Sequence, residues 1–222
     1  FFQVLPVTDA LHKLLAQTLN PLPTEHIVTT SALGRVLAAA PQSPQDLPPF
    51  RRSAMDGYAV RASDTFGASQ SLPAYLSVAG AVRMGEVPTL RLSTAQAAEI
   101  HTGAMLPEDA DAVVMIERTQ KISEAEIEVL APVASGENVI QIGEDVQAGA
   151  PILPAGHRLR PQDIGGLLAA GVLQVEVFAA PRVGLLSSGD ELVPAEQTPA
   201  LGQIREINAA ALAALVSELG AV

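Results

Sequence analysis

Four short segments of the chain combine glycine with polar side chains that could bind a small ion. They are residues 53–60, 100–107, 143–145 and 187–191, which read SAMDGYAV, IHTGAMLP, GED and SSGDE. In the second segment, a threonine hydroxyl and the neighbouring amides could donate to an anion. In the third, adjacent carboxylates on a glycine loop offer the oxygen ligands that divalent cations prefer.

Each segment also has an ordinary structural interpretation. An Asp-Gly pair such as 56–57 is usually a turn, because glycine tolerates positive φ and aspartate bonds the local backbone. The Thr-Gly pair at 102–103 is most simply a turn as well. At 143–145 a cation site and a solvated turn are equally good interpretations. Only 187–191 favours function, because it follows a predicted buried strand, where α/β sheets bind ligands.

Composition and missing motifs exclude several classes of protein. The 222 residues carry a net charge of −11 with 13 scattered Lys and Arg, whereas a nucleic-acid surface needs clustered cations. The absence of Cys excludes disulfides, thiolate nucleophiles and Cys-ligated zinc, and it fits a reducing cytoplasm. The His residues lack ligand spacing, and there is no Walker A loop, G-x-G-x-x-G fingerprint or G-x-S-x-G elbow. No signal peptide or membrane-spanning run is expected.

The elements that must position these segments are predicted to be short, because 17 Gly and 17 Pro interrupt the chain. Helices are expected from Thr8-Asp9 to Asn20-Pro21, from 29–30 to just before Pro41, at 161–170 with Gly171 as the stop, and at 208–219. The second helix would carry Leu33, Val36 and Leu37 on one side. The proline-rich stretch 41–49 must be extended and predicts a domain boundary.

Short strands dominate the predicted middle of the chain. A small β-rich, barrel-like domain is expected from strands at 58–60, 75–78, 90–92, 112–116 and 126–130. Further strands are expected at 149–156, 175–178 and 182–187, the last of them buried. Strand 182–187, the loop at 189–191 and the final helix would open an α/β domain.

Taken together, the segments resemble the MoeA/gephyrin-E family of molybdopterin molybdenumtransferases. The residues that carry this resemblance are 53–59, 102–107, 110–115, Glu117, 143–145 and 188–192. Their order and spacing are also those of the family. The resemblance covers essentially all of this chain, but only about the first half of a typical member.

The resemblance implies an α+β multidomain fold. Residues 8–46 and 146–180 would form a discontinuous domain of helices and strands, and 47–145 would be the inserted β-rich, barrel-like domain. Residues 181–222 would be the first strand and helix of a truncated α/β domain of the molybdopterin-binding type.

The resemblance also implies a role in molybdenum cofactor biosynthesis. Such enzymes are cytoplasmic transferases that insert molybdate into adenylylated molybdopterin and release AMP, with Mg²⁺ or another divalent cation. The family is homodimeric, with a cleft between the α/β part of one subunit and the inserted part of the other. A molybdopterin adenylyltransferase acting upstream is a further expected partner, whereas nucleic acid and membrane are not.

Site residues follow from motif position in the resemblance. Catalytic roles are expected for Asp56, Thr102, Asp145 and Glu191, with Thr102 donating to phosphate or molybdate and the two aspartates orienting a cation or water. Metal positioning is expected for Asp190 and Glu191. Substrate contacts are expected from Ser53, Met55, Gly57, Gly103, Ser188 and Gly189.

The sequence departs from the family pattern in several places. Arg51-Arg52 stand where Asp-Asn is usual, Ile140 where Arg is common, and Glu206-Ile207 where a pair such as Asp-Ser is usual. The two arginines are expected to alter the local electrostatic field. Because the chain ends at Val222, it is expected to be inactive alone. A non-catalytic dimerisation or scaffold module of the gephyrin type and a small-anion-binding protein are the alternatives.

Overall fold

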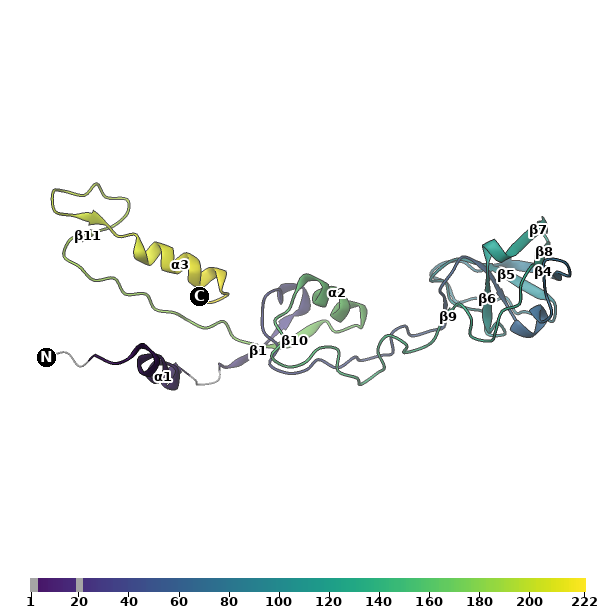
Figure 1. Ribbon diagram of the computed structural model, residues 1–222, viewed down its shortest axis with the longest axis horizontal. Helices are drawn as coiled ribbons and strands as arrows, with labels where there is room; N and C mark the ends of the chain where they lie inside the picture. The colour runs from purple at the N-terminus through teal and green to yellow at the C-terminus, as the bar shows by residue number, and fades with distance from the viewer. Residues whose placement is uncertain (1–3, 19–21) are drawn as a thin grey trace. The chain divides into compact units, whose positions relative to one another are not determined.

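The computed structural model describes residues 4–18 and 22–222, and the chain forms two compact units (Figure 1). Residues 42–150 make up one, which we call the inserted unit, and 1–41 with 151–222 make up the other, the two-segment unit. The chain enters and leaves the inserted unit at one place, since Ser43 N donates to Ala150 O and Gly149 N donates to Ser43 O, at 2.9 and 2.8 Å. The separate third part expected from residue 181 stays a prediction.

A curled six-stranded sheet forms the inserted unit, as the sequence predicted for a small β-rich domain. The strand order is β6-β3-β5-β4-β8-β7, and every pair is antiparallel except β4 with β5. The strands are β3 Gly57–Val60, β4 Ala74–Ala81, β5 Gln96–Ile100, β6 Ala112–Met115, β7 Thr119–Ser123 and β8 Glu126–Val129. Outside the sheet lie the β2–β9 pair (Arg52–Ser53, Val139–Ile140) and the 3-10 turns η2 Ala62–Thr65 and η3 Ile116–Arg118.

The central strand β3 is buried on both faces of this sheet. Tyr58 and Val60 pack into one apolar cluster with Leu76 and Ile127, while Ala59 packs into a second cluster on the opposite face. This division follows from the alternation of side chains along a strand. Because only 3% of residues are aromatic, Val, Ile, Leu and Ala fill both clusters.

In the two-segment unit, residues from both ends of the chain share one core. Strand β1 Thr24–Val28 pairs antiparallel with β10 Gln174–Phe178, and helix α2 Pro161–Ala169 contributes the buried Leu167. Leu37 joins Leu167 in the apolar cluster. Helix α1 Val7–Thr18 precedes this core along the chain.

The final forty residues contain little regular structure. Strand β11 Leu192–Val193 pairs in parallel with β12 Ile204–Arg205, and helix α3 Asn208–Glu218 follows. Val183 N donates to Val222 O at 2.8 Å, and Val222 N donates to Pro181 O at 2.9 Å. These two bonds follow the pattern of a parallel ladder, but residues 182–187 and 221–222 form no regular strand.

The predicted helices at residues 8–19, 161–170 and 208–219 are confirmed as α1, α2 and α3. Leu19 and the expected stop at Asn20-Pro21 lie outside the described residues. The helix predicted from 29–30 to Pro41 is wrong, because only the 3-10 turn η1 Thr29–Ser31 forms. Gly34 then adopts a φ of +76°, and Leu37 N donates to His157 O instead of to its own segment.

Three predicted strands are also wrong. Residues 90–92 and 149–156 contain no strand, and Gly149 and Gly156 adopt positive φ in turns. Residues 182–187 are extended but exposed, and they form no strand. Among the described residues, their only backbone hydrogen-bond partner is Val222. Strands β1, β5 and β7 were missed, since their sequences TEHIV, QAAEI and TQKIS are polar for strands.

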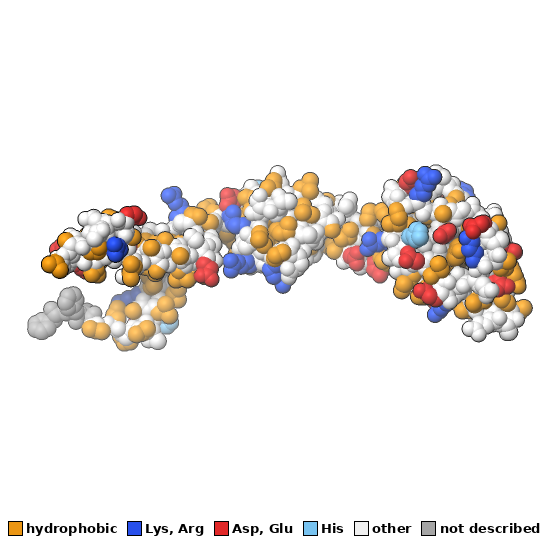
Figure 2. All heavy atoms as spheres, turned by 90° about the horizontal axis from the view of Figure 1, so that it is seen from above, with side chains coloured by type: hydrophobic (Ala, Val, Ile, Leu, Met, Phe, Trp, Pro, Cys, Tyr) orange, Lys and Arg blue, Asp and Glu red, His pale blue; other side chains and the backbone are white. Residues whose placement is uncertain are grey.

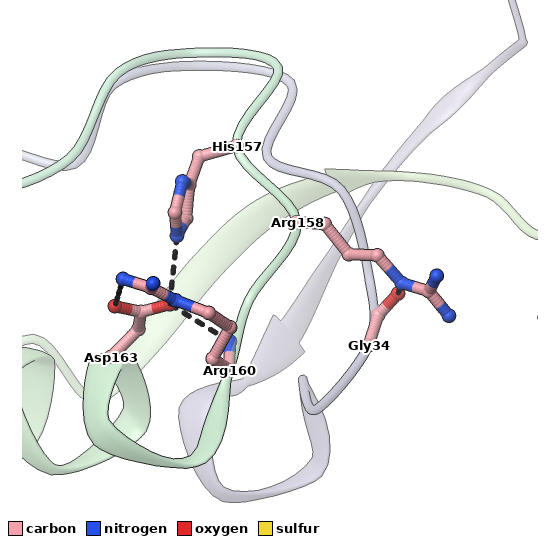
Figure 3. A network of polar contacts seen from close by, with 5 residues as sticks. All are labelled: Gly34, His157, Arg158, Arg160 and Asp163. Atoms are coloured by element: carbon pink, nitrogen blue, oxygen red, sulfur yellow. Dashed lines mark hydrogen bonds and ion pairs between the residues drawn. The ribbon is translucent and has the colours of Figure 1, made fainter.

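A polar network anchors the start of helix α2 (Figure 3). The buried carboxylate of Asp163 accepts hydrogen bonds from Arg160 N at 2.8 Å and Arg160 Nε at 3.0 Å. His157 Nε2 lies 2.7 Å from Asp163 Oδ2. Nearby, Arg158 Nε donates to Gly34 O at 3.2 Å. The network thereby ties one free amide of the helix start to side chains.

Replacing Asp163 by asparagine should therefore destabilise the two-segment unit at neutral pH. Hydrogen bonds from Arg160 and then His157 hold the pKa of Asp163 far below its ordinary value of 3.8, although burial opposes them. A depressed carboxyl pKa stabilises the folded state above the unfolded pKa, and this contribution is lost as pH falls through the folded value. The melting temperature of Asp163→Asn should lie a few degrees lower at pH 7, and the gap should narrow below about pH 3.8.

The measurement is the melting temperature of the unchanged protein and of Asp163→Asn at several pH values between 7 and 2.5. Glu218→Gln, which removes an exposed carboxylate of the same unit, serves as the control and should shift the melting temperature little at any pH. A gap between Asp163→Asn and the unchanged protein that stayed constant across this range would contradict the assignment.

Candidate functional site: an aspartate–threonine cluster at the end of the sheet

Asp56 and Thr102 meet at one end of the six-stranded sheet. Because β3 and β5 are antiparallel with Gly57 opposite Ile100, the residue before β3 and the residues after β5 lie at the same end. Asp56 Oδ1 accepts hydrogen bonds from the backbone N of Thr102 at 2.7 Å and from its Oγ1 at 3.1 Å. We call Asp56, His101 and Thr102 the Asp56 cluster.

The carboxylate of Asp56 is held in its ionised form. The backbone N–H and then the hydroxyl of Thr102 lower the pKa of Asp56, and the nearby His101 contributes less. His101 Nδ1 lies 3.6 Å from Asp56 Oδ1, and the two side chains are 63% and 60% exposed. Oδ2 has no hydrogen-bond partner within residues 4–18 and 22–222, so it can accept from a ligand or from water. Both Thr102 donors are already used, so donation to phosphate or molybdate would require their release.

Ser53 and Gly103 build the turns that carry the cluster. Ser53 is fully buried, and its hydroxyl donates to Met55 O. Its backbone N donates to Ala104 O, and Gly103 N donates to Ser53 O, at 2.9 and 2.8 Å. The buried hydroxyl of Ser53 is thus occupied inside its own turn, while Met55 is partly exposed beside it. Their expected substrate contacts stay predictions.

Arg51 and Arg52 have different environments. Arg51 donates from Nη1 to Ala110 O at 3.1 Å and from Nη2 to Glu108 O at 3.2 Å, so it supports a turn. Arg52 Nη2 lies 3.6 Å from Asp145 Oδ2, which is an ion pair rather than a hydrogen bond. Of the two arginines, only Arg52 therefore adds a cation close to a predicted site residue.

The predicted site residues near the carboxyl end of the chain lie in the two-segment unit. Residues 187–191 are exposed, and the buried strand expected at 182–187 is not formed, so the function expected for this segment stays a prediction. Glu206 Oε1 accepts from Ser187 Oγ at 3.0 Å and from Ala209 N at 2.8 Å, which caps the start of α3. Ser187 and Glu206, together with Leu192, Pro194 and their neighbours, line a surface pocket of about 530 Å³.

The structure brings two predicted site residues, Asp56 and Thr102, together in the inserted unit, where Asp145 also pairs with Arg52. The predicted residues Ser188, Gly189, Asp190 and Glu191 belong to the other unit. Among the residues that the structure describes, no group of three or more His, Asp or Glu side chains could hold a metal ion. The side chains of the described residues are therefore a poor fit to a divalent cation within one chain.

Three side chains at or near these sites were not predicted as site residues: His101, Glu206 and Arg52. His101 could have been found, because it directly precedes Thr102 in a motif that the sequence already singled out. The contacts of Glu206 with Ser187 and of Arg52 with Asp145 join residues far apart in the sequence, so spacing in the sequence does not reveal them.

Known proteins of one family match this chain. Residues 5–171 match the family described as the MoeA N-terminal region (domain I and II). A molybdopterin molybdenumtransferase from Nostoc is 40% identical over 89% of this chain and 45% of its own length. One from Synechococcus elongatus is 36% identical over 98% and 54%. The chain thus spans about half the length of the curated relatives it matches.

Solved structures agree with the sequence matches. A crystal structure of the molybdopterin biosynthesis MoeA protein from Pyrococcus horikoshii is 39% identical and superposes with a TM-score of 0.89. The match covers 99% of this chain and 58% of that one, and a second structure of this protein gives a TM-score of 0.83. These matches confirm the mixed α and β fold and the resemblance read from the motifs. The chain belongs to the MoeA family.

Proposed function

We propose that this chain supplies one side of the site at which molybdate is inserted into adenylylated molybdopterin with release of AMP. The Asp56 cluster carries this proposal, because it places an ionised carboxylate, a hydroxyl and an imidazole together at an exposed sheet end. The names of the relatives, molybdopterin molybdenumtransferase, support the reaction class. Asp56 would hold Thr102 and orient a water or a substrate hydrogen through its free oxygen.

The complete site would need more than this chain. Asp56 and Asp145 belong to the inserted unit and Glu191 to the other, so a cleft between two copies would let both sets act on one substrate. We therefore propose a homodimer, Mg²⁺ or another divalent cation bound with the help of substrate oxygens, and a cytoplasmic location. No helix of residues 4–18 and 22–222 is long and apolar enough to cross a membrane.

Asp56→Ala should abolish turnover in a protein completed with the second half that the relatives carry. Loss of the carboxylate frees Thr102 and misplaces the cluster, which should lower kcat/KM about 100-fold or more. Glu191→Ala should have a comparable effect. The assay is AMP release from adenylylated molybdopterin in the presence of molybdate, and circular dichroism should show an intact fold for both variants.

Glu124→Ala is the matched control, because its carboxylate lies exposed on the inserted unit and is ion-paired with Lys121. Turnover by this variant should equal that of the unchanged protein. If the completed protein dimerised but Asp56→Ala and Glu191→Ala left turnover intact, the site would lie elsewhere. If the completed protein had no activity, a dimerisation or scaffold role would replace the proposal. The 222-residue chain alone is expected to be inactive.

A further inference from the structure

Arg52 has an unusual shortage of hydrogen-bond partners. Its Nε is buried without a partner among the described residues, which is costly for a charged donor. Its terminal nitrogens make no hydrogen bond with the described residues, and Asp145 lies 3.6 Å away. A guanidinium offers five N–H donors in a planar fork, so Arg52 retains a large unused capacity.

The surroundings offer Arg52 no better protein partner. Asp46 Oδ1 accepts from Ala148 N at 2.8 Å, and Glu144 Oε2 accepts from Gln141 N at 2.7 Å. One carboxylate oxygen of each of these acids therefore already accepts from a backbone amide. The side chains of Arg52 and Asp145 are 36% and 53% exposed, and exposed pairs at this separation contribute little stability. Folding alone does not explain why an arginine stands here.

Backbone pairing fixes Arg52 close to the predicted site. In the β2–β9 pair it lies opposite Ile140, and an isolated bridge joins it to Met105, in the turn that follows Thr102. Ser53, its neighbour on β2, points inward and is buried, so the side chain of Arg52 leaves the opposite face of the strand. The side chain is 36% exposed and can therefore be reached from solvent.

We propose that Arg52 is a specificity-determining residue that binds a tetrahedral oxyanion, with Asp145 holding the guanidinium in place. The planar guanidinium can donate two parallel hydrogen bonds to two oxygens of a phosphate or an oxometalate. Such charge-assisted hydrogen bonds are stronger than those between neutral groups. The inference deepens the proposed function and rests on it for the choice of oxyanion. Arg51 does not share this role, because both its terminal nitrogens donate to backbone carbonyls.

Binding of inorganic molybdate and inorganic phosphate to the 222-residue chain tests the inference directly. Arg52→Gln should weaken binding at least tenfold by isothermal titration calorimetry, since charge-assisted bonds are lost. Arg52→Lys should recover only part of the affinity, because a point charge replaces the fork. The Nε–Hε signal of Arg52 in a nitrogen-15 spectrum should shift when the anion is added to the unchanged chain.

Arg51→Lys is the matched control and should lower stability while leaving oxyanion affinity within twofold. Asp145→Asn should lower affinity less than Arg52→Gln does, because the guanidinium remains but loses the carboxylate that holds it in place. If Arg52→Gln lowered stability as Asp145→Asn does, with no change in affinity and no shift of the Arg52 signal, the residue would be a structural ion pair and the inference would be overturned.

Kinetics of the completed protein identify the source of the oxyanion. A rise in the KM for molybdate alone upon Arg52→Gln would assign the free oxometalate to Arg52, and a rise in the KM for the pterin would assign the substrate phosphate. Unchanged KM values beside an active parent would overturn the inference and leave the proposed function standing. An inactive parent would contradict the proposed function, while the calorimetry would still decide whether Arg52 binds oxyanions.

Discussion

Replacing Gly57 by alanine should unfold the inserted unit. A Cβ at this position would lie 2.0 Å from the backbone oxygen of Val114 and 2.9 Å from the backbone nitrogen of Ile116. Both atoms belong to the backbone that runs beside β3 along β6, so neither can rotate away. Because β3 is buried on both faces, the strand cannot move outward without opening both apolar clusters. A loss of about 4 kcal/mol or more is expected.

Thermal or urea unfolding of the chain measures this loss. The matched control is Gly67→Ala, since Gly67 also has a positive φ, +85°, but its Cβ would meet nothing within 4 Å. Gly67→Ala should cost only about 1–2 kcal/mol, the strain of a left-handed alanine. Equal destabilisation by the two substitutions would show that the backbone angle matters and that the close approach of β6 does not.

Leu37→Ala should destabilise the two-segment unit by about 2–5 kcal/mol, since it removes a fully buried side chain from the core. Leu33→Ala, four residues earlier, should change stability by less than about 0.5 kcal/mol, because Leu33 is 59% exposed. On a helix the two leucines would share one face and both would be buried. Denaturant unfolding of the two variants therefore tests the backbone that replaces the predicted helix.

A large loss of stability in both variants would favour the helix that the periodicity of residues 29–40 predicts. A small loss in both would mean that the cluster around Leu167 does not depend on Leu37. Only the unequal result agrees with Gly34 turning the chain and Leu37 bridging to Val177.

The elements that the sequence predicts well are those whose signals are local. Pro161 at the start of α2 and Gly171 after it, at a φ of +88°, mark a helix by their own chemistry. The apolar run of β6 marks a buried strand in the same way. Strand β5 was missed, because QAAEI becomes a central strand only through its partners β3 and β4. The prediction for residues 182–187 fails for the opposite reason. Their apolar sequence predicts a buried strand, but the described residues supply few backbone hydrogen-bond partners.

The candidate site shows the same division. The motifs identify Asp56 and Thr102. The register of β3 with β5 then brings Asp56 Oδ1 to 2.7 Å from the backbone N of Thr102. The difference between Arg51 and Arg52 could not be predicted, because it depends on which carbonyls and carboxylates the fold brings near each guanidinium. On the face shown in Figure 2, Lys and Arg side chains are scattered, as the low count of cations suggested.

The two-segment unit has a consequence for the order in which the chain can fold. Thr29 Oγ1 donates to Val172 O across 143 residues of sequence. Strand β1 likewise cannot pair until β10 is present, because β10 is its partner strand. During synthesis the whole inserted unit leaves the ribosome before β10 does, and its own contacts are complete by then. The inserted unit should therefore fold first and shorten the effective loop between β1 and β10, which lowers the entropy cost of closing it. Substitutions that unfold the inserted unit should slow assembly of the unit that surrounds it in sequence.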